Sequence, residues 1–337
     1  MTTTLDDSVK GKKVDFDSIP VIDIATLVDG SDIDSVAKEL RHVCENVGFL
    51  YVKNHGISDD TINDMLKLTR EFFDLPVSVK NNIHIKDSGT TLRGYIGMYE
   101  ENVDPEKTKD YKECYDMGAN SDDSIPFFGM NRFPDAELPE FGKVATAYHD
   151  AMLKLGKSLS QGIAVSLGLE KDFFDDRLSD PITIQRFLHY PPQTGKIDES
   201  KMGIGAHTDY GFLTILYQDD IGGLQVQNHS GEWVSAPPIP GTFVINMGDL
   251  LQTLTGGRFV STMHRVINAS GKERYSMPFF MDMNFNAEVK VVPTCENIAV
   301  EKVEPYKCGH HKFSRFVDSF PHLEGIDVKA TLDAVPE

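Results

Sequence analysis

The stretch from about residue 182 to residue 292 constrains the fold most strongly, because it consists of short β-rich runs at close spacing. Gly, Asp, Asn and Pro separate these runs, and these residues favour turns. Many short strands joined by turns are typical of a sandwich, a barrel or a jelly roll. The runs are ITIQRFLHY, FLTILYQ, GLQVQ, EWVSAPP, TFVINMG, HRVINA and RYSMPFFMDM. We therefore predict a mainly β core, of jelly-roll type, over residues 182–292.

Helical patterns lie before and after this β-rich stretch. Capping residues start two amphipathic patterns, SDIDSVAKELRHVCENVG and SDDTINDMLKLTREFFDLP, and the longest helical pattern covers Glu140–Leu169. A further helix is expected over residues 305–320. Because the helices cluster on either side of the strands, the sequence predicts an α+β fold and not a doubly wound sheet. We expect a mainly helical region, residues 19–170, to pack on the core within a single domain of residues 1–337.

The composition disfavours several classes of partner. The chain has 337 residues and a formal net charge of −19, whereas binding to nucleic acid or to an anionic membrane surface needs clustered lysine and arginine. No apolar run approaches membrane-spanning length, and no signal-peptide pattern is seen. The four cysteines are far apart and form no C-x-x-C motif, so we expect a reducing, cytoplasmic compartment. A small-molecule substrate is the expected partner, and a monomer is favoured.

The segment GAHTDYG holds a histidine and an aspartate two positions apart, His207 and Asp209. Alternate residues of a strand face the same side, so both side chains can point into a β core. A tight metal site needs a third ligand, and His264, which also opens a β-rich run, is the best candidate. Two histidines and one carboxylate leave the opposite positions of a metal open, which suits non-haem Fe(II), although Zn²⁺ would accept the same ligands. We expect Asn246 and Asp249 to support a turn and a helix start rather than bind metal.

Arg274 and Ser276 lie two positions apart in RYSMPFF, shortly after His264. An arginine and a hydroxyl on one face of a strand can bind a carboxylate through a bidentate fork and one further donor. A buried arginine without a partner would be costly, so an anion should meet it. That anion is either the carboxylate of a ligand or an aspartate of the protein itself, and this segment alone leaves both readings open.

Three segments together resemble the Fe(II)/2-oxoglutarate-dependent dioxygenases of the isopenicillin N synthase-like group. They are GAHTDYGFLTILYQD with GGLQV (205–226), INMGDLLQTLTGGRFVSTMHRV (245–266) and RYSMPFF (274–280). The N-terminal IPVIDI, GFLYVKNHGI and FFDLP are similar to that group as well. The resemblance runs from about residue 19 to about residue 318, and it implies a double-stranded β-helix, a cupin-like variant of the jelly roll.

The resemblance also implies which residues form the site. The implied iron ligands are His207, Asp209 and His264. Arg274 and Ser276 match the residues that bind the distal carboxylate of 2-oxoglutarate, and Tyr190 matches a tyrosine that helps to hold this co-substrate.

The implied activity is the oxidative decarboxylation of 2-oxoglutarate by O₂, coupled to the hydroxylation, desaturation or ring closure of a small-molecule metabolite of specialised metabolism. Ascorbate is a candidate reductant. One alternative is an oxidase that needs no 2-oxoglutarate, like isopenicillin N synthase itself, because RYSMPFF fits that subgroup. The glutamine ligand typical of its C-terminus, however, has no counterpart in FPHLEGIDVKATLDAVPE. The other alternative is a non-catalytic small-molecule sensor on the same fold.

Residues 86–136 are rich in Gly, Asp, Asn and Pro without a sustained period, so we expect a long, loop-rich connection there. In the resembling group, the region that matches TLRGYIGMYEEN (91–102) lies over the mouth of the active site. Taken singly, its side chains are more often structural than substrate-binding, and Tyr95 is the first choice for a contact. The candidate substrate contacts are Arg93, Tyr95 and Tyr99 in this region, and Phe280 as a pocket wall.

Overall fold

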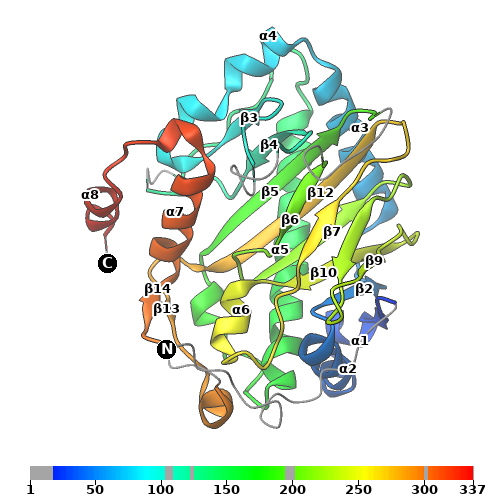
Figure 1. Ribbon diagram of the computed structural model, residues 1–337, viewed down its shortest axis with the longest axis vertical. Helices are drawn as coiled ribbons and strands as arrows, with labels where there is room; N and C mark the ends of the chain where they lie inside the picture. Colours follow the sequence, from blue (N-terminus) through cyan, green and yellow to red (C-terminus); the bar gives the residue numbers. More distant parts are fainter. Residues whose placement is uncertain (1–17, 103–108, 122–124, 194–201, 300–302, 337) are drawn as a thin grey trace.

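The computed structural model describes residues 18–102, 109–121, 125–193, 202–299 and 303–336. Its core consists of a large sheet of eight strands and a small sheet of four strands (Figure 1). The strand order is β1-β2-β10-β7-β12-β5-β4-β3 in the large sheet and β6-β11-β8-β9 in the small sheet. β1 and β2 pair in parallel, and the other pairs in these two sheets are antiparallel. The β core predicted over residues 182–292 is confirmed.

The strands of the large sheet are β1 (Val21–Asp23), β2 (Phe49–Lys53), β3 (Gly94–Ile96), β4 (Glu113–Met117), β5 (Pro181–Tyr190), β7 (Leu213–Gln218), β10 (Thr242–Met247) and β12 (Arg274–Asn284). Those of the small sheet are β6 (Ile204–His207), β8 (Leu224–Gln227), β9 (Trp233–Ser235) and β11 (His264–Val266). A separate two-stranded sheet consists of β13 (Glu288–Val289) and β14 (Tyr306–Lys307).

The helices are α1 (Ala25–Val28), α2 (Ile33–Asn46), α3 (Asp59–Asp74), α4 (Val77–Lys80), α5 (Phe141–Ser166), α6 (Asp249–Leu254), α7 (Cys308–Ser319) and α8 (Val328–Asp333). Short 3₁₀ helices occupy Asn81–Ile83, Ile85–Thr91, Asp176–Leu178, Pro293–Ile298 and Pro321–Leu323.

The helices begin where the capping residues predict. The side chain of Asp32 accepts the backbone N–H of Ser35 at the start of α2, and Ser58 accepts that of Thr61 at the start of α3. α5 and α7 match the helices expected over 140–169 and 305–320 to within a few residues. Because these ends are set by local side chains, the sequence alone could place them.

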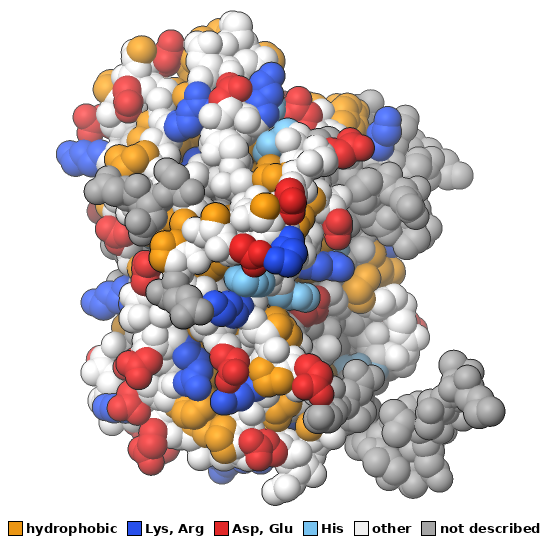
Figure 2. All heavy atoms as spheres, turned by 90° about the vertical axis from the view of Figure 1, so that its left-hand side faces the viewer, with side chains coloured by type: hydrophobic (Ala, Val, Ile, Leu, Met, Phe, Trp, Pro, Cys, Tyr) orange, Lys and Arg blue, Asp and Glu red, His pale blue; other side chains and the backbone are white. Residues whose placement is uncertain are grey.

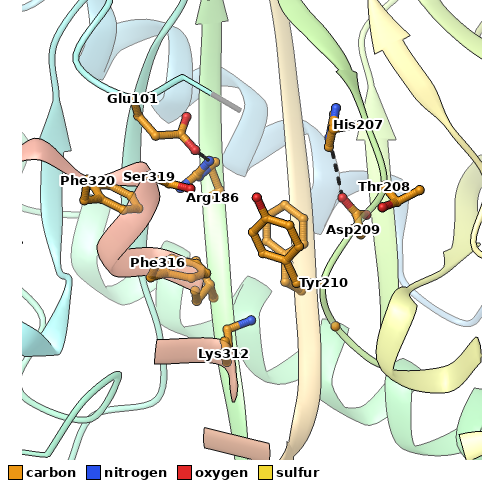
Figure 3. A pocket seen from close by; sticks show the side chains of 13 residues that line it. Glu101, Arg186, His207, Thr208, Asp209, Tyr210, Lys312, Phe316, Ser319 and Phe320 are labelled. Atoms are coloured by element: carbon orange, nitrogen blue, oxygen red, sulfur yellow. Dashed lines mark hydrogen bonds and ion pairs between the residues drawn. The ribbon is translucent and has the colours of Figure 1, made fainter. Parts of the chain in front are cut away.

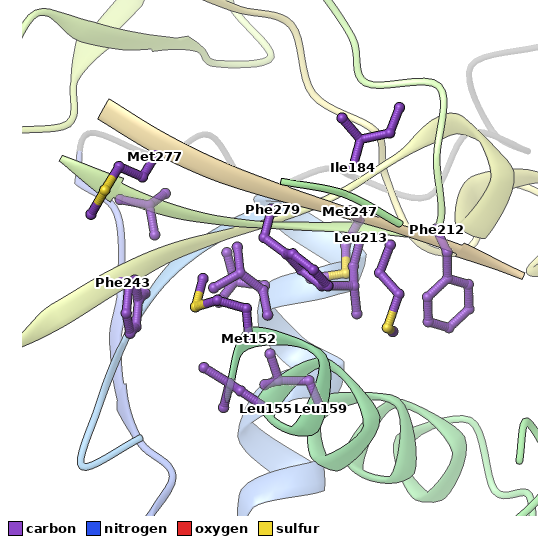
Figure 4. Close-up of a cluster of buried hydrophobic side chains, with 14 of the residues drawn as sticks. Met152, Leu155, Leu159, Ile184, Phe212, Leu213, Phe243, Met247, Met277 and Phe279 are labelled. Carbon is purple, nitrogen blue, oxygen red and sulfur yellow. The ribbon is translucent and has the colours of Figure 1, made fainter. Parts of the chain in front are cut away.

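The longest helix, α5, covers one face of the large sheet. Its residues Met152, Leu155 and Leu159 point towards Phe279 of β12 and Leu213 of β7 (Figure 4). All five side chains are at most 3% exposed. This packing leaves the opposite face of β5, β7 and β12 for a cavity between the two sheets.

The region of residues 86–136, expected to be loop-rich, contains two strands that extend the large sheet beside β5. β4 reads ECYDM and is buried throughout, although it carries two carboxylates. Glu113 pairs with Lys80 at 2.8 Å and Asp116 with Arg186 at 2.8 Å, so the charges are compensated inside the protein. Acidic residues within a buried strand interrupt the apolar pattern, which is why the sequence did not reveal it. The N-terminal region therefore supplies β3 and β4, which the sequence did not reveal, in addition to β1 and β2.

The face of the molecule that carries α7 and α8 has acidic and basic side chains interspersed with small apolar areas (Figure 2). The large negative charge of the chain is thus not gathered into one block on this face. Among the helices of the described residues, none combines the length and the apolar character needed to cross a membrane.

Candidate active site

The three candidate metal ligands meet at one point between the two sheets. His207 is the last residue of β6, His264 is the first residue of β11, and the two are paired directly across these antiparallel strands. Their ring centroids are 4.2 Å apart. Asp209 follows β6, and its Oδ1 lies 3.6 Å from Nε2 of each histidine. The register of β6 and β11 therefore completes the triad.

The backbone determines which nitrogen of each histidine is free. Nδ1 of His207 donates to the carbonyl of Gly205 at 2.9 Å, and Nδ1 of His264 donates to the carbonyl of Thr262 at 3.1 Å. The neutral form of each ring therefore carries its proton on Nδ1 and leaves the lone pair of Nε2 on the side of Asp209. Although burial opposes this, the hydrogen bond and the charge of Asp209 raise the pKa of His207. Burial, together with the neighbouring His207, lowers the pKa of His264 to about 4. This ring is therefore neutral at pH 7, as a metal ligand must be.

Two side chains from the large sheet orient Asp209. Thr214 Oγ1 on β7 donates to Oδ2 at 2.5 Å, and Asn246 Nδ2 on β10 donates to the same oxygen at 2.7 Å, which leaves Oδ1 on the histidine side. Although burial opposes ionisation, the protonated forms of His264 and His207 and the hydrogen bond from Asn246 hold the pKa of this carboxyl well below its usual range. The turn predicted at Asn246 is wrong, because this residue lies in a strand and orients a candidate ligand. Asp249 begins α6, as predicted.

This donor set fits a divalent transition metal. Two atoms that bind one ion at about 2.1 Å each can be at most about 4.2 Å apart, and the separations of 3.6 Å satisfy this limit. The three ligand atoms lie within 4.8 Å of one another, and the described residues contain no second group of this kind. Two imidazoles and one carboxylate on one side leave further positions open, as in non-haem Fe(II) sites.

Arg274 lies on β12, fully buried, beside the same space. Its Nη1 donates to Ser276 Oγ at 3.3 Å, its Nη2 to Gln218 Oε1 at 3.2 Å, and its Nε to the carbonyl of Gly222. The ring of Tyr190 lies 4.6 Å from the guanidinium carbon. Among the described residues, no carboxylate forms an ion pair with Arg274. The protein's own carboxylates therefore leave this positive charge available to a ligand.

Two adjoining cavities contain these groups. The inner cavity is lined by the three candidate metal ligands and by Arg274, Ser276 and Tyr190. The outer cavity shares Glu101, Arg186, His207, Asp209 and Phe280 with it (Figure 3). Alternate residues of two neighbouring strands supply one wall, as the period of a strand requires. They are Ile184, Arg186, Leu188 and Tyr190 on β5, and Arg274, Ser276, Pro278 and Phe280 on β12.

The structure places the four predicted substrate contacts in different environments. Phe280 lines both cavities, as expected. Tyr95 is buried on β3 and donates its hydroxyl to Glu113 at 2.6 Å, and Arg93 is buried with its guanidinium on a backbone carbonyl. Neither residue lines either cavity. This geometry does not support a substrate contact at Tyr95, which was the first choice, and it gives both side chains structural roles. Tyr99 is 47% exposed, and its contact with substrate stays a prediction.

Comparison with known proteins identifies the family. A model described as the N-terminal part of non-haem dioxygenases in morphine synthesis matches residues 19–136, and the model of the 2OG-Fe(II) oxygenase superfamily matches residues 179–282. A homoarginine-6-hydroxylase of Arabidopsis thaliana is 38% identical over 84% of this chain and 90% of its own length. The chain belongs to the 2OG-Fe(II) oxygenase superfamily.

Two further relatives agree with this assignment. A 1-aminocyclopropane-1-carboxylate oxidase of Dictyostelium mucoroides is 34% identical over 85% of this chain and 88% of its own length. The crystal structure of a full-length Neurospora crassa protein in complex with alpha-KG (2-oxoglutarate) superimposes with a TM-score of 0.81 at 30% identity, covering 89% of this chain and 96% of that one. The predicted fold and enzyme class are confirmed: the two sheets form a double-stranded β-helix flanked by helices, and the protein is an oxygenase that uses Fe(II), 2-oxoglutarate and O₂ on a small molecule.

Sequence reasoning missed a buried group of charged side chains at the boundary of the two cavities. Arg186 forms a bidentate pair with Asp116, with Nε and Nη2 each 2.8 Å from a carboxylate oxygen, and its Nη1 donates to Glu101 at 3.0 Å. Lys112 pairs with Glu101 at 2.6 Å and with Asp110 at 2.8 Å. The sequence contained a signal for Arg186, because this residue lies on the same face of β5 as Tyr190, the tyrosine predicted to help hold 2-oxoglutarate. None marked Glu101, whose position depends on partners far away in the sequence.

The C-terminal helix α7 closes one side of the outer cavity. Lys312, Phe316 and Ser319 of this helix and the following Phe320 line it (Figure 3). Lys312 also forms a buried ion pair with Asp282 of β12, which ties α7 to the large sheet. The candidate active site is thus enclosed by strands within the matched region of residues 179–282 and by α7, which lies outside that region.

Proposed function

We propose that His207, Asp209 and His264 hold the Fe(II) of this oxygenase, and that Arg274 and Ser276 bind the far carboxylate of 2-oxoglutarate. The observation that carries the proposal is the convergence of three free ligand atoms beside a buried arginine that has no carboxylate partner among the described residues. Tyr190 supports the proposal because its ring packs against the guanidinium and limits where a diacid can lie.

The chain's own residues position the reactants. The hydrogen bonds from Thr214 and Asn246 hold the carboxylate of Asp209 with one oxygen towards the two histidines. The guanidinium of Arg274 and the hydroxyl of Ser276 give the diacid one orientation, and apolar side chains exclude water around it. Those apolar residues of the inner cavity are Leu188, Leu216, Leu224 and Val266. When bound, Fe(II) and 2-oxoglutarate supply the oxidation of an unactivated C–H bond by O₂, with succinate and CO₂ as co-products.

A succinate assay tests this assignment. The Fe(II)-loaded protein should convert 2-oxoglutarate to succinate in the presence of O₂ and a panel of candidate substrates. Asp209→Ala should abolish this conversion and the binding of Fe(II), because it removes one of three ligands. The matched control is Asp220→Ala, an exposed aspartate nearby, which should keep both. Full succinate formation by a folded Asp209→Ala protein would overturn the ligand assignment.

The same assay separates the two alternatives. Consumption of O₂ without succinate would indicate an oxidase that needs no 2-oxoglutarate. Stoichiometric binding of Fe(II) and 2-oxoglutarate without consumption of either, over a broad panel, would indicate a sensor. The open coordination positions and the free guanidinium of Arg274 favour the 2-oxoglutarate-dependent enzyme over both.

We also propose that the substrate is an amino acid. The two relatives named after a substrate act on homoarginine and on 1-aminocyclopropane-1-carboxylate, each of which carries an amino group and a carboxylate. We further propose that the enzyme is cytoplasmic, in agreement with its four buried cysteines, which form no disulfides, and that it is a monomer. Size-exclusion chromatography with light scattering tests the monomer.

A further inference from the structure

Glu101 and Arg186 stand side by side at the boundary of the inner and outer cavities. Figure 3 shows them on one side of the open space, with His207 and Asp209 on the other side. Both residues are 8% exposed, and both line both cavities. A ligand at this boundary therefore has the pair on one side and two of the candidate metal ligands on the other.

The pair has unused hydrogen-bonding capacity. Oε1 of Glu101 accepts a hydrogen bond from Arg186. Oε2 is buried and, apart from the ion pair with Lys112 Nζ at 2.6 Å, accepts no hydrogen bond from the described residues. Arg186 uses three of its N–H groups on the carboxylates of Asp116 and Glu101. A guanidinium has five such groups, so two remain for a ligand.

The pair is also rigid and ionised. Arg186 is held from behind by two parallel hydrogen bonds to Asp116, and Lys112 donates to the backbone carbonyl of Glu101 at 3.1 Å. Although burial opposes ionisation, Arg186 and Lys112 hold the pKa of Glu101 well below its usual range. A fixed carboxylate beside a fixed guanidinium can form charge-assisted hydrogen bonds with an ammonium and a carboxylate of one ligand.

We propose that Glu101 and Arg186 form the head-group site for an α-amino acid, with the ammonium on the carboxylate of Glu101 and the carboxylate on the remaining N–H groups of Arg186. The ammonium and the carboxylate of one amino-acid head group compensate each other and can each meet an opposite charge of this pair. The aromatic wall of Phe280, Phe316 and Phe320 is then left for the substrate's side chain. This proposal rests on the proposed amino-acid oxygenase, and it adds the residues that select the substrate.

The first test uses the wild-type protein loaded with Fe(II) and 2-oxoglutarate without O₂. Calorimetric titrations with L-homoarginine, L-arginine, L-lysine and 1-aminocyclopropane-1-carboxylate are compared with titrations of their N-acetyl and carboxamide derivatives. At least one free amino acid should bind, and blocking either end should raise its Kd by about 10- to 150-fold. Equal affinity for a blocked derivative, or binding of none of these probes, would overturn the proposal.

The second test uses Glu101→Gln, with Glu100→Gln as the matched control. The side chain of Glu100 is 49% exposed and its Oε2 lies 2.7 Å from Nε2 of His84, away from both cavities. Glu101→Gln should erase the difference between the free amino acid and its N-acetyl derivative, whereas Glu100→Gln should keep it. A purely structural role for Glu101 would weaken both ligands alike, and this outcome would contradict the proposal. If Glu101→Gln does not fold, the titrations of the blocked derivatives against the wild-type protein decide whether the proposal holds.

The two proposals fail in different ways. The Kd of 2-oxoglutarate, measured before any amino acid is added, reports on Arg274 and the metal site alone. Loss of amino-acid selectivity with intact 2-oxoglutarate binding therefore concerns only the head-group site, whereas failure to bind Fe(II) or 2-oxoglutarate in the wild-type protein concerns the proposed function.

Discussion

Replacing Arg274 should separate the binding of 2-oxoglutarate from the stability of the fold. The guanidinium is fully buried, with three hydrogen bonds to neutral groups and no carboxylate partner among the described residues. A buried charge without a counter-ion contributes little to the stability of the ligand-free protein, and its replacement can be neutral. Arg274→Gln should therefore leave the melting temperature of the ligand-free protein nearly unchanged.

The effect on the co-substrate should be large. Truncating one partner of a buried charge pair costs about 2–5 kcal/mol, which raises the Kd of 2-oxoglutarate by about 30- to 5000-fold. Arg274→Lys keeps the charge but loses the planar fork, so its Kd should lie between those of the wild type and the glutamine variant. A ligand that binds only the folded state raises the melting temperature, and this rise should disappear in Arg274→Gln at the same 2-oxoglutarate concentration.

The assay is an anaerobic calorimetric titration of the metal-loaded protein, with thermal unfolding in parallel. Arg265→Gln is the matched control, because this arginine lies 3.9 Å from the ring of Trp233, donates to Gln225 and lines neither cavity. It should bind 2-oxoglutarate as the wild type does. A folded Arg274→Gln protein with an unchanged Kd would refute the reasoning, and so would an equal loss in Arg265→Gln.

Three further predictions concern the supports of the site and the pH response. Asn246→Ala should weaken Fe(II) binding by about 10- to 100-fold in a metal titration, because it removes a hydrogen bond that orients a ligand; an unchanged affinity would contradict this role. Lys312→Met leaves Asp282 buried without its cation, so urea denaturation should show a loss of about 3–5 kcal/mol, whereas Lys329→Met, in an exposed pair, should change little. Burial would lower the pKa of His189, but hydrogen bonds to two glutamates raise it. Its stabilising effect is therefore complete below about pH 6.5 and is lost as the pH rises through the raised native pKa; His189→Gln should flatten this decline, and an identical pH profile would argue against it.

The parts of the site that follow from local periodicity could be predicted from the sequence. The spacing of two put Arg274 and Ser276 on one face of β12 and brought His207 and Asp209 to the same cavity, although Asp209 lies just beyond the end of β6. The position of His264 at the start of a β-rich run made it the best candidate for the third ligand, and the family resemblance supported it. Its actual place depends on the direct pairing of β11 with β6, which no local pattern encodes.

What the sequence did not reveal depends on long-range partners. Glu101 reaches the cavity because Arg186 and Lys112 hold its carboxylate there. Arg186 of β5 is distant from Glu101 in the chain, and Lys112 lies on another segment. Tyr95 was expected at the mouth of the site, but its strand directs the hydroxyl to Glu113 of β4. The loop prediction failed there for the same reason, since the buried ion pairs that permit charges in β4 are visible only in three dimensions.

The most direct test of the central claim is a crystal structure with Mn²⁺ in place of Fe(II) and with 2-oxoglutarate, read from the anomalous scattering of the metal. We expect one peak at about 2.0–2.2 Å from His207 Nε2, Asp209 Oδ1 and His264 Nε2, and the far carboxylate of 2-oxoglutarate on Arg274 and Ser276. A peak elsewhere, a His264 ring turned away from the metal, or a carboxylate of the protein against Arg274 would contradict the account.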